Sequence, residues 1–299
     1  GLGVLNLEGL WTRYEDPRIP LGEIASMPSK HATRRMQEIY SAPIRPELIK
    51  ERIKTIRDAG VTVAASLSPQ RTAELHKAVI DAGVDIFVIR GTTVSAEHVG
   101  NDASVLNLKK FIYELDVPVI VGGVATLTGA LHLMRAGAAG VLVGFGGGAA
   151  HTTREVLGIE VPMASAVAEV AAARREYLDE SGGRYVHVIA DGSVGRSGDI
   201  AKAIACGADA VMMGSPLAKA TQAPGLGWHW GSEAHHPELP RGGRVNVGTV
   251  GSLEEILLGP SRTADGSMNL FGALRRAMAT SGYSDVKAFQ RVEVIIHGA

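Results

Sequence analysis

Short apolar runs alternate with amphipathic stretches along most of the chain. Four times, a small residue, a glycine and another small or branched residue lead directly into an apolar run, at positions 59–61, 82–84, 136–138 and 206–208. Each of these glycines is placed to end a helix, and the next strand then begins within about two residues. This repeated sequence pattern is typical of the turns from helix to strand in a parallel α/β protein.

Apolar runs that end in glycine or polar residues predict seven strands, separated by stretches with helical periodicity. The expected strands span residues 3–6, 62–66, 85–89, 118–121, 140–144, 185–190 and 210–213. The clearest expected helices span residues 71–82, 128–136, 165–180 and 197–206. This alternating order predicts an α/β fold, a TIM (β/α)8 barrel, and because a closed barrel needs eight strands, we expect the first strand and helix to be missing from the N-terminus. The alternative is an open seven-stranded sheet.

Two stretches interrupt the alternation within what we expect to be a single barrel domain, 1–299. Residues 11–46 contain five prolines among mixed charges, which predicts an irregular excursion too short for an inserted domain. Residues 222–269 follow the last strand and form a polar, aromatic loop on the active face of the barrel, with 222–246 as a candidate lid.

The composition and net charge of the chain restrict the kinds of molecule that we expect it to bind. The 299 residues are 45% hydrophobic and 5% aromatic with 37 glycines, which suits one large α/β domain with tight turns. A net charge of −1 provides no basic field for nucleic acid or an anionic membrane. No leader and no apolar run of about 18 residues is present, so we expect neither a signal peptide nor a membrane span. One cysteine excludes an internal disulfide and indicates a cytoplasmic protein.

Candidate chemistry lies at the ends of the last three predicted strands. A glycine-rich stretch at 145–154 lets successive backbone N–H groups turn toward an anion. In barrels, the loops after the last two strands commonly bind phosphate, and a carboxylate beside them can accept two hydrogen bonds from ribose hydroxyls. We therefore predict a seat for a nucleoside monophosphate. Its residues are Gly148, Asp191, Gly192, Ser193, Gly214 and Ser215.

Plainer interpretations stay open. Glycine-rich loops are often only tight turns, and Asp191 can instead cap the helix that starts near Ser197. Three histidines and a glutamate in the candidate lid raise the question of zinc. They lie in a proline-bearing loop without a His-x₃-His pattern on a helix, which favours a solvated lid and no metal site. These four residues are His229, Glu233, His235 and His236.

Sequence motifs follow one another at residues 1–6, 119–123, 143–148, 152–154, 190–192, 196–199, 214–218, 251–254 and 274–278. In this order, and over nearly the whole chain, they resemble the IMP dehydrogenase and GMP reductase family. The similarity is greatest to the IMP dehydrogenase-related paralogues of actinobacteria, which lack the inserted pair of CBS domains. Segment 11–46 is where that pair would sit.

The resemblance implies a ligand, a cofactor and an assembly. The ligand would be a purine nucleoside monophosphate (IMP, XMP or GMP), in GMP biosynthesis, with NAD or NADP as cofactor and a homotetramer as the assembly. The ribose-binding aspartate of the family matches Asp191, and its phosphate contacts match Gly192, Gly214 and Ser215.

The chain differs from the family at positions that match the active site of the family. His151 replaces the cysteine that attacks the purine C2, whereas Thr153 matches a threonine of the family active site. The single Cys206 precedes the last strand, at the opposite end of the barrel. The flap shrinks to 259–269 without its Arg-Tyr pair, and the loop that holds a monovalent cation is rewritten around 146–150, so we do not assume that ion. Three further changes are Arg90 for an aspartate, Val124 for an asparagine and Ala149 for a phosphate-binding serine.

Two functional hypotheses survive. The first is an oxidoreductase of IMP dehydrogenase or GMP reductase type with His151 and Thr153 as catalytic residues. His151 would act as a nucleophile or as an acid or base, or would hydrogen-bond the purine or the phosphate. The second is a catalytically silent paralogue that binds purine nucleotide as a sensor or as a partner subunit. Fold alone does not choose between them.

Overall fold

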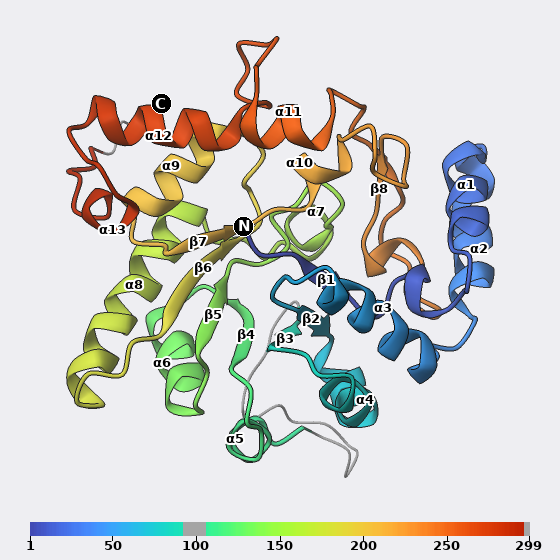
Figure 1. Cartoon of the computed structure of the whole chain (residues 1–299), viewed down its shortest axis with the longest axis horizontal. Helices are drawn as coiled ribbons and strands as arrows, with labels where there is room; N and C mark the ends of the chain where they lie inside the picture. Colours follow the sequence, from blue (N-terminus) through green and yellow to red (C-terminus); the bar gives the residue numbers. More distant parts are fainter. Residues whose placement is uncertain (92–105, 296–299) are drawn as a thin grey trace.

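Seven parallel strands form one curled sheet in which neighbours in sequence are neighbours in space (Figure 1). The structure is a computed structural model that describes residues 1–91 and 106–295. All seven predicted strands are confirmed, with boundaries within three residues of those expected. They are β1 (Val4–Asn6), β2 (Ala64–Leu67), β3 (Ile86–Arg90), β4 (Val119–Val124), β5 (Gly140–Val143), β6 (His187–Asp191) and β7 (Ala210–Met212).

The strand order is that of a TIM barrel. Each pair from β1·β2 to β6·β7 is parallel, and helices cover the outer side of the curled sheet (Figure 1). β1 and β7 stand at the two ends of the order and do not pair with each other in the described residues. Every residue of β2 and β5 is buried, as expected for strands that pack on both faces, and this explains why they appear in the sequence as continuous apolar runs.

Helices connect successive strands, and further helices form the C-terminal part of the chain. The four helices expected from the sequence are confirmed to within two residues. None of the described helices is long and apolar enough to cross a membrane. The connecting helices are α3 (Pro46–Asp58), α4 (Pro69–Asp81), α5 (Leu108–Tyr113), α6 (Leu127–Arg135), α7 (Thr153–Leu157), α8 (Met163–Glu180), α9 (Ser197–Ala205) and α10 (Ser215–Ala218). They are followed by α11 (Leu253–Leu258), α12 (Leu270–Thr280) and α13 (Val286–Phe289).

Segment 11–46 is more regular than its prolines suggested. It contains two helices, α1 (Arg18–Ser26) and α2 (Ser29–Tyr40). Pro17 and Pro28 directly precede these helices, and Pro46 opens α3. Proline is tolerated there because the first turn of a helix has free N–H groups in any case. The prediction of irregular structure is therefore wrong: these prolines mark where helices begin.

The hairpin of α1 and α2 has a small hydrophobic core of its own. Figure 1 shows the two helices at one side of the molecule, next to the loop that carries β8 (Trp228–His229). This strand pairs in antiparallel fashion with β9 (Val245–Asn246). Ala234, from that loop, belongs to the same core as the helices. The other members of this core are Leu10, Leu21, Ile24, Ala32, Met36 and Ile39.

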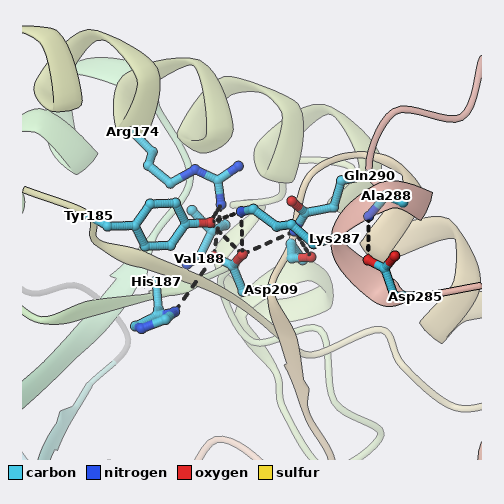
Figure 2. A network of polar contacts seen from close by, with 10 residues as sticks. Arg174, Tyr185, His187, Val188, Asp209, Asp285, Lys287, Ala288 and Gln290 are labelled. Carbon is cyan, nitrogen blue, oxygen red and sulfur yellow. Dashed lines mark hydrogen bonds and ion pairs between the residues drawn. The ribbon is translucent and has the colours of Figure 1, made fainter. Parts of the chain in front are cut away.

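A partly buried carboxylate ties the amino ends of the last strands together (Figure 2). Asp209, directly before β7, accepts hydrogen bonds from Arg174 (2.8 Å), Tyr185 (2.6 Å) and the backbone N–H of Val188 (2.9 Å). Gln290 adds a bond of 3.0 Å. Burial raises the pKa of Asp209, but the hydrogen bonds and the charge of Arg174 outweigh burial and lower the pKa. This charged group lies at the opposite end of the strands from the predicted site.

We expect Asp209→Asn to reduce the free energy of unfolding at pH 7 by about 2–3 kcal/mol, because five donors, including Lys287 at 3.4 Å, would face an amide in place of a carboxylate. Since the pKa of Asp209 is lowered in the folded state, its contribution is present above the unfolded value of about 3.9 and is lost as the pH falls through the folded value. Urea denaturation at several pH values measures both effects. The control Asp179→Asn, on the exposed side of α8, should change stability by less than about 0.5 kcal/mol. Equal losses in the two variants would contradict this role.

Candidate functional site

The predicted site residues lie at one end of the sheet. Arg90 ends β3, the loop 144–154 follows β5, and Asp191 ends β6. Gly214 and Ser215 follow β7, where Ser215 begins α10. Because the strands are parallel, all of these positions lie at the carboxyl edge of the sheet, where barrels build their sites.

Two of the predicted loops lie against each other, residues 146–148 after β5 and residues 192–193 after β6. We call this pair of backbone segments the cradle. The N–H of Ser193 donates to the carbonyl of Gly147 at 2.9 Å. Gly192 has φ +104°, and a Cβ placed there would lie 3.0–3.3 Å from the backbone of Gly147. Glycine is favoured here because a side chain would be strained at this positive φ and would crowd the backbone of Gly147. Ser193 itself adopts φ +54°, a left-handed conformation that is uncommon for serine and is often found at functional sites.

Gly214 and Ser215 do not contact the cradle directly in the described part of the chain. Among the described hydrogen bonds, none joins them to the cradle of 146–148 and 192–193. A Cβ on Gly214 would lie 3.7 Å from the ring of His229, which belongs to the predicted lid. The lid segment therefore reaches this face of the barrel, as its position after the last strand indicated.

Asp191 forms an ion pair that the sequence analysis did not foresee. Arg90 donates from Nε to Oδ2 at 2.9 Å and from Nη2 to Oδ1 at 3.4 Å. The Asp191 side chain is 13% exposed and that of Arg90 is 41% exposed. The alternative that Asp191 caps α9 is wrong, because Asp199 accepts from the N–H groups of Gly195 and Arg196 there. A ribose that binds to Asp191 would have to share it with a guanidinium.

His151 meets a buried carboxylate. Its Nδ1 lies 3.1 Å from Oε1 of Glu233, which is 82 positions away and 5% exposed. Burial raises the pKa of Glu233, but the hydrogen bond and charge of His151, and then the charge of Arg241 at 3.7 Å, lower it overall. Glu233 is therefore an ionised group inside the site. The prediction of a solvated lid is wrong for this residue.

The side chains around Tyr40 explain why the lid is folded against the protein. The ring of His235 stacks on Tyr40 with centroids 3.5 Å apart, and burial lowers the pKa of His235 to about 4. Trp230 donates to the hydroxyl of Tyr40 at 2.9 Å, and Gln37 donates to the carbonyl of His236 at 2.9 Å. His235 thus acts as a neutral packing group. Over residues 1–91 and 106–295, no group of three or more His, Cys, Asp or Glu side chains is arranged to hold a metal.

Arg244 ties the far end of the lid to the helical hairpin. Its guanidinium donates to the carbonyls of Ile24, Ala25 (2.9 Å) and Met27 at the end of α1, and lies 4.0 Å from the centre of the Trp228 ring. The carbonyl oxygens at a helix end have no partners within the helix, so a charged donor stabilises them. Through this contact and the shared core, α1 and α2 hold the loop that carries Glu233.

Several buried polar atoms around His151 have no hydrogen-bond partner in the described part of the chain. They are the hydroxyls of Thr152 and Thr153, Oε2 of Glu233 and Nε of Arg241, and Thr153 is 0% exposed. Buried polar groups are normally hydrogen-bonded, so a local group of unpaired ones is typical of a ligand site. Thr153 was predicted from the sequence as a site residue, Glu233 was assigned to a solvated lid, and Arg241 was not predicted at all. The available signal was a glutamate within an aromatic-rich loop.

These features define a (β/α)-barrel protein with polar side chains gathered at the carboxyl ends of its strands. Barrel enzymes have their active sites at this end. The sequence profile of the IMP dehydrogenase / GMP reductase domain matches residues 33–234. The chain belongs to the IMP dehydrogenase/GMP reductase family.

Individual relatives agree with this assignment. A Mycolicibacterium smegmatis protein named "Uncharacterized oxidoreductase" is 53% identical over 304 residues, covering 99% of this chain and 81% of that protein. A crystal structure of an IMP dehydrogenase/GMP reductase-like protein from Corynebacterium glutamicum matches with a TM-score of 0.92 and 51% identity, covering 99% of this chain and 79% of the other. A GMP reductase from Trypanosoma brucei in complex with guanosine 5'-triphosphate matches with a TM-score of 0.57 and 27% identity, over 78% and 45% of the two chains. The resemblance to actinobacterial members of the family is confirmed.

We expect Arg244→Ala to loosen the lid, because three helix-end carbonyls lose a charged donor. Amide hydrogen exchange in residues 229–236 should become at least about tenfold faster, which corresponds to about 1.4 kcal/mol of local stability. The control Arg276→Ala removes an exposed arginine of α12 and should leave that exchange unchanged. Unchanged exchange in Arg244→Ala would show that the hairpin does not hold the lid.

Proposed function

We propose that this protein is an oxidoreductase that acts on a purine nucleoside monophosphate (IMP, XMP or GMP) with NAD or NADP, in guanine nucleotide metabolism. The observation that carries the proposal is the glycine cradle of 146–148 and 192–193, set between Asp191 and the unpaired hydroxyl of Thr153. A homotetramer in the cytoplasm remains an expectation from the family and the composition.

The cradle suits an anionic ligand for a physical reason. Glycines allow a phosphate to approach the backbone closely, and N–H groups donate to it without a bulky side chain in between. Asp191 offers carboxylate oxygens at the edge of the same cradle, and Gly214 and Ser215 provide backbone at the end of the next strand. These residue types fit a nucleoside monophosphate better than an apolar ligand.

His151 stands where the family has its nucleophilic cysteine. A neutral imidazole can accept a proton on one nitrogen and donate from the other, which favours an acid or base role. A bound nicotinamide cofactor would supply hydride exchange. The proton chemistry falls to His151 and its neighbours.

A second function is favoured by one specific observation. The Arg90–Asp191 pair neutralises the carboxylate that would otherwise bind the ribose. A catalytically silent paralogue that binds purine nucleotide as a sensor or partner subunit could tolerate such a change. The two functions make different predictions for turnover and for binding.

For nucleotide binding, we expect Asp191→Ala to weaken the binding of IMP, XMP or GMP by about 2 kcal/mol, or roughly 30-fold, through lost charge-assisted hydrogen bonds. Isothermal titration calorimetry measures this. The companion variant Arg90→Gln leaves Asp191 free for the ribose and should bind at least as tightly as the wild type. If both variants bind like the wild type, the ribose is not held by Asp191.

For turnover, we expect nicotinamide absorbance to change when the protein is mixed with one of the three nucleotides and an oxidised or reduced cofactor. His151→Ala should abolish the change, a loss of about 100-fold or more, because the proton-transferring group is removed. His151→Cys should allow a covalent adduct with IMP that mass spectrometry detects. Nucleotide binding without turnover for any pair would support the silent paralogue instead.

A further inference from the structure

The contact between His151 and Glu233 joins two segments that are held independently of each other. His151 follows the cradle glycines after β5, whereas Glu233 lies in the loop that α1 and α2 hold in place. The distance from Nδ1 to Oε1 is 3.1 Å, and the side chains are 22% and 5% exposed. A carboxylate buried to this extent costs desolvation, so an anchored loop is needed to keep it in place.

The contact determines which nitrogen of His151 carries hydrogen. An ionised carboxylate only accepts hydrogen bonds, so Nδ1 is the donor whether the ring is neutral or protonated, and in the neutral ring Nε2 keeps its lone pair. A Cβ placed on Gly148 would lie 3.1 Å from Cδ2 and 3.8 Å from Nε2 of His151. The edge of the ring that carries Nε2 therefore faces the cradle, away from Glu233.

The surroundings of the pair are polar and partly unsatisfied. Arg241 lies 3.7 Å from the carboxylate of Glu233, and Arg90, His229 and His235 are the other charged or titratable groups that act on the pair. A Cβ on Gly146 would meet both the Thr153 hydroxyl and Cβ of His151, so the backbone of the cradle packs against both residues.

We propose that Glu233 is a positioning residue that holds His151 in the Nδ1–H form, so that Nε2 accepts a proton from a ligand hydroxyl or a water in the cradle. In this step the O–H bond breaks, its electron pair stays on oxygen, and the proton bonds to Nε2. The imidazolium that forms is stabilised by the ionised Glu233 and later releases the proton to solvent. No covalent bond forms between His151 and the ligand. The identity of the ligand rests on the proposed function, but the pairing does not.

The first test reads the tautomer of His151 by nitrogen-15 NMR in the full chain without nucleotide. We expect the Nδ1–H form in the wild type, assigned by comparison with His151→Gln. Glu233→Gln keeps an accepting oxygen and should retain this form, whereas Glu233→Leu should shift the ring toward the Nε2–H form. Glu238→Gln, an exposed change in the same loop, is the matched control and should alter nothing. A wild-type ring in the Nε2–H form overturns the proposal.

The second test separates kcat from KM. Glu233→Gln should lower kcat by about 10- to 100-fold with KM for the nucleotide changed less than about twofold, because charge stabilisation of the imidazolium is lost while binding is kept. A wild-type kcat in Glu233→Gln overturns the positioning role even if His151→Ala is inactive. If the wild-type protein shows no turnover, the proposed function fails, and the tautomer measurement still decides the pairing.

Discussion

Parallel pairing of strands in sequential order is the constraint on which the rest of the structure depends. It places the carboxyl ends of β3, β5, β6 and β7 at one edge of the sheet, so that Arg90, the loop 144–154, Asp191 and Gly214 face the same region. Buried apolar side chains on both faces of the strands hold this order. At the opposite edge, the charged Asp209 joins β6, β7 and the C-terminal helices. One edge thus holds a stabilising polar network, and the other holds the candidate site.

The site is completed by a part of the chain that is not in the barrel. The hairpin of α1 and α2 shares a hydrophobic core with Ala234, next to Glu233, and receives Arg244 at the end of α1. Here a short hairpin supports an active-face loop, so the support of the hairpin and the geometry of His151 are linked through Glu233.

Two side chains of the candidate site each have a charged partner. His151 pairs with Glu233, and Arg90 pairs with Asp191. The Ser193–Gly147 hydrogen bond joins the two loops that carry His151 and Asp191. In barrel folds, function lies in such side chains set on a stable framework.

The sequence by itself determined the strands, four of the helices and the barrel order, because periodicity and glycine turns are local signals. It also identified the 145–154 loop and Asp191, since both directly follow strands. Only the tertiary structure decided that residues 11–46 are helical, that Asp191 meets Arg90 and that His151 meets Glu233. Arg90 and Asp191 are 101 positions apart in the sequence, and His151 and Glu233 are 82 positions apart. These contacts depend on where loops fold over the barrel, and no local pattern of residue types encodes that placement.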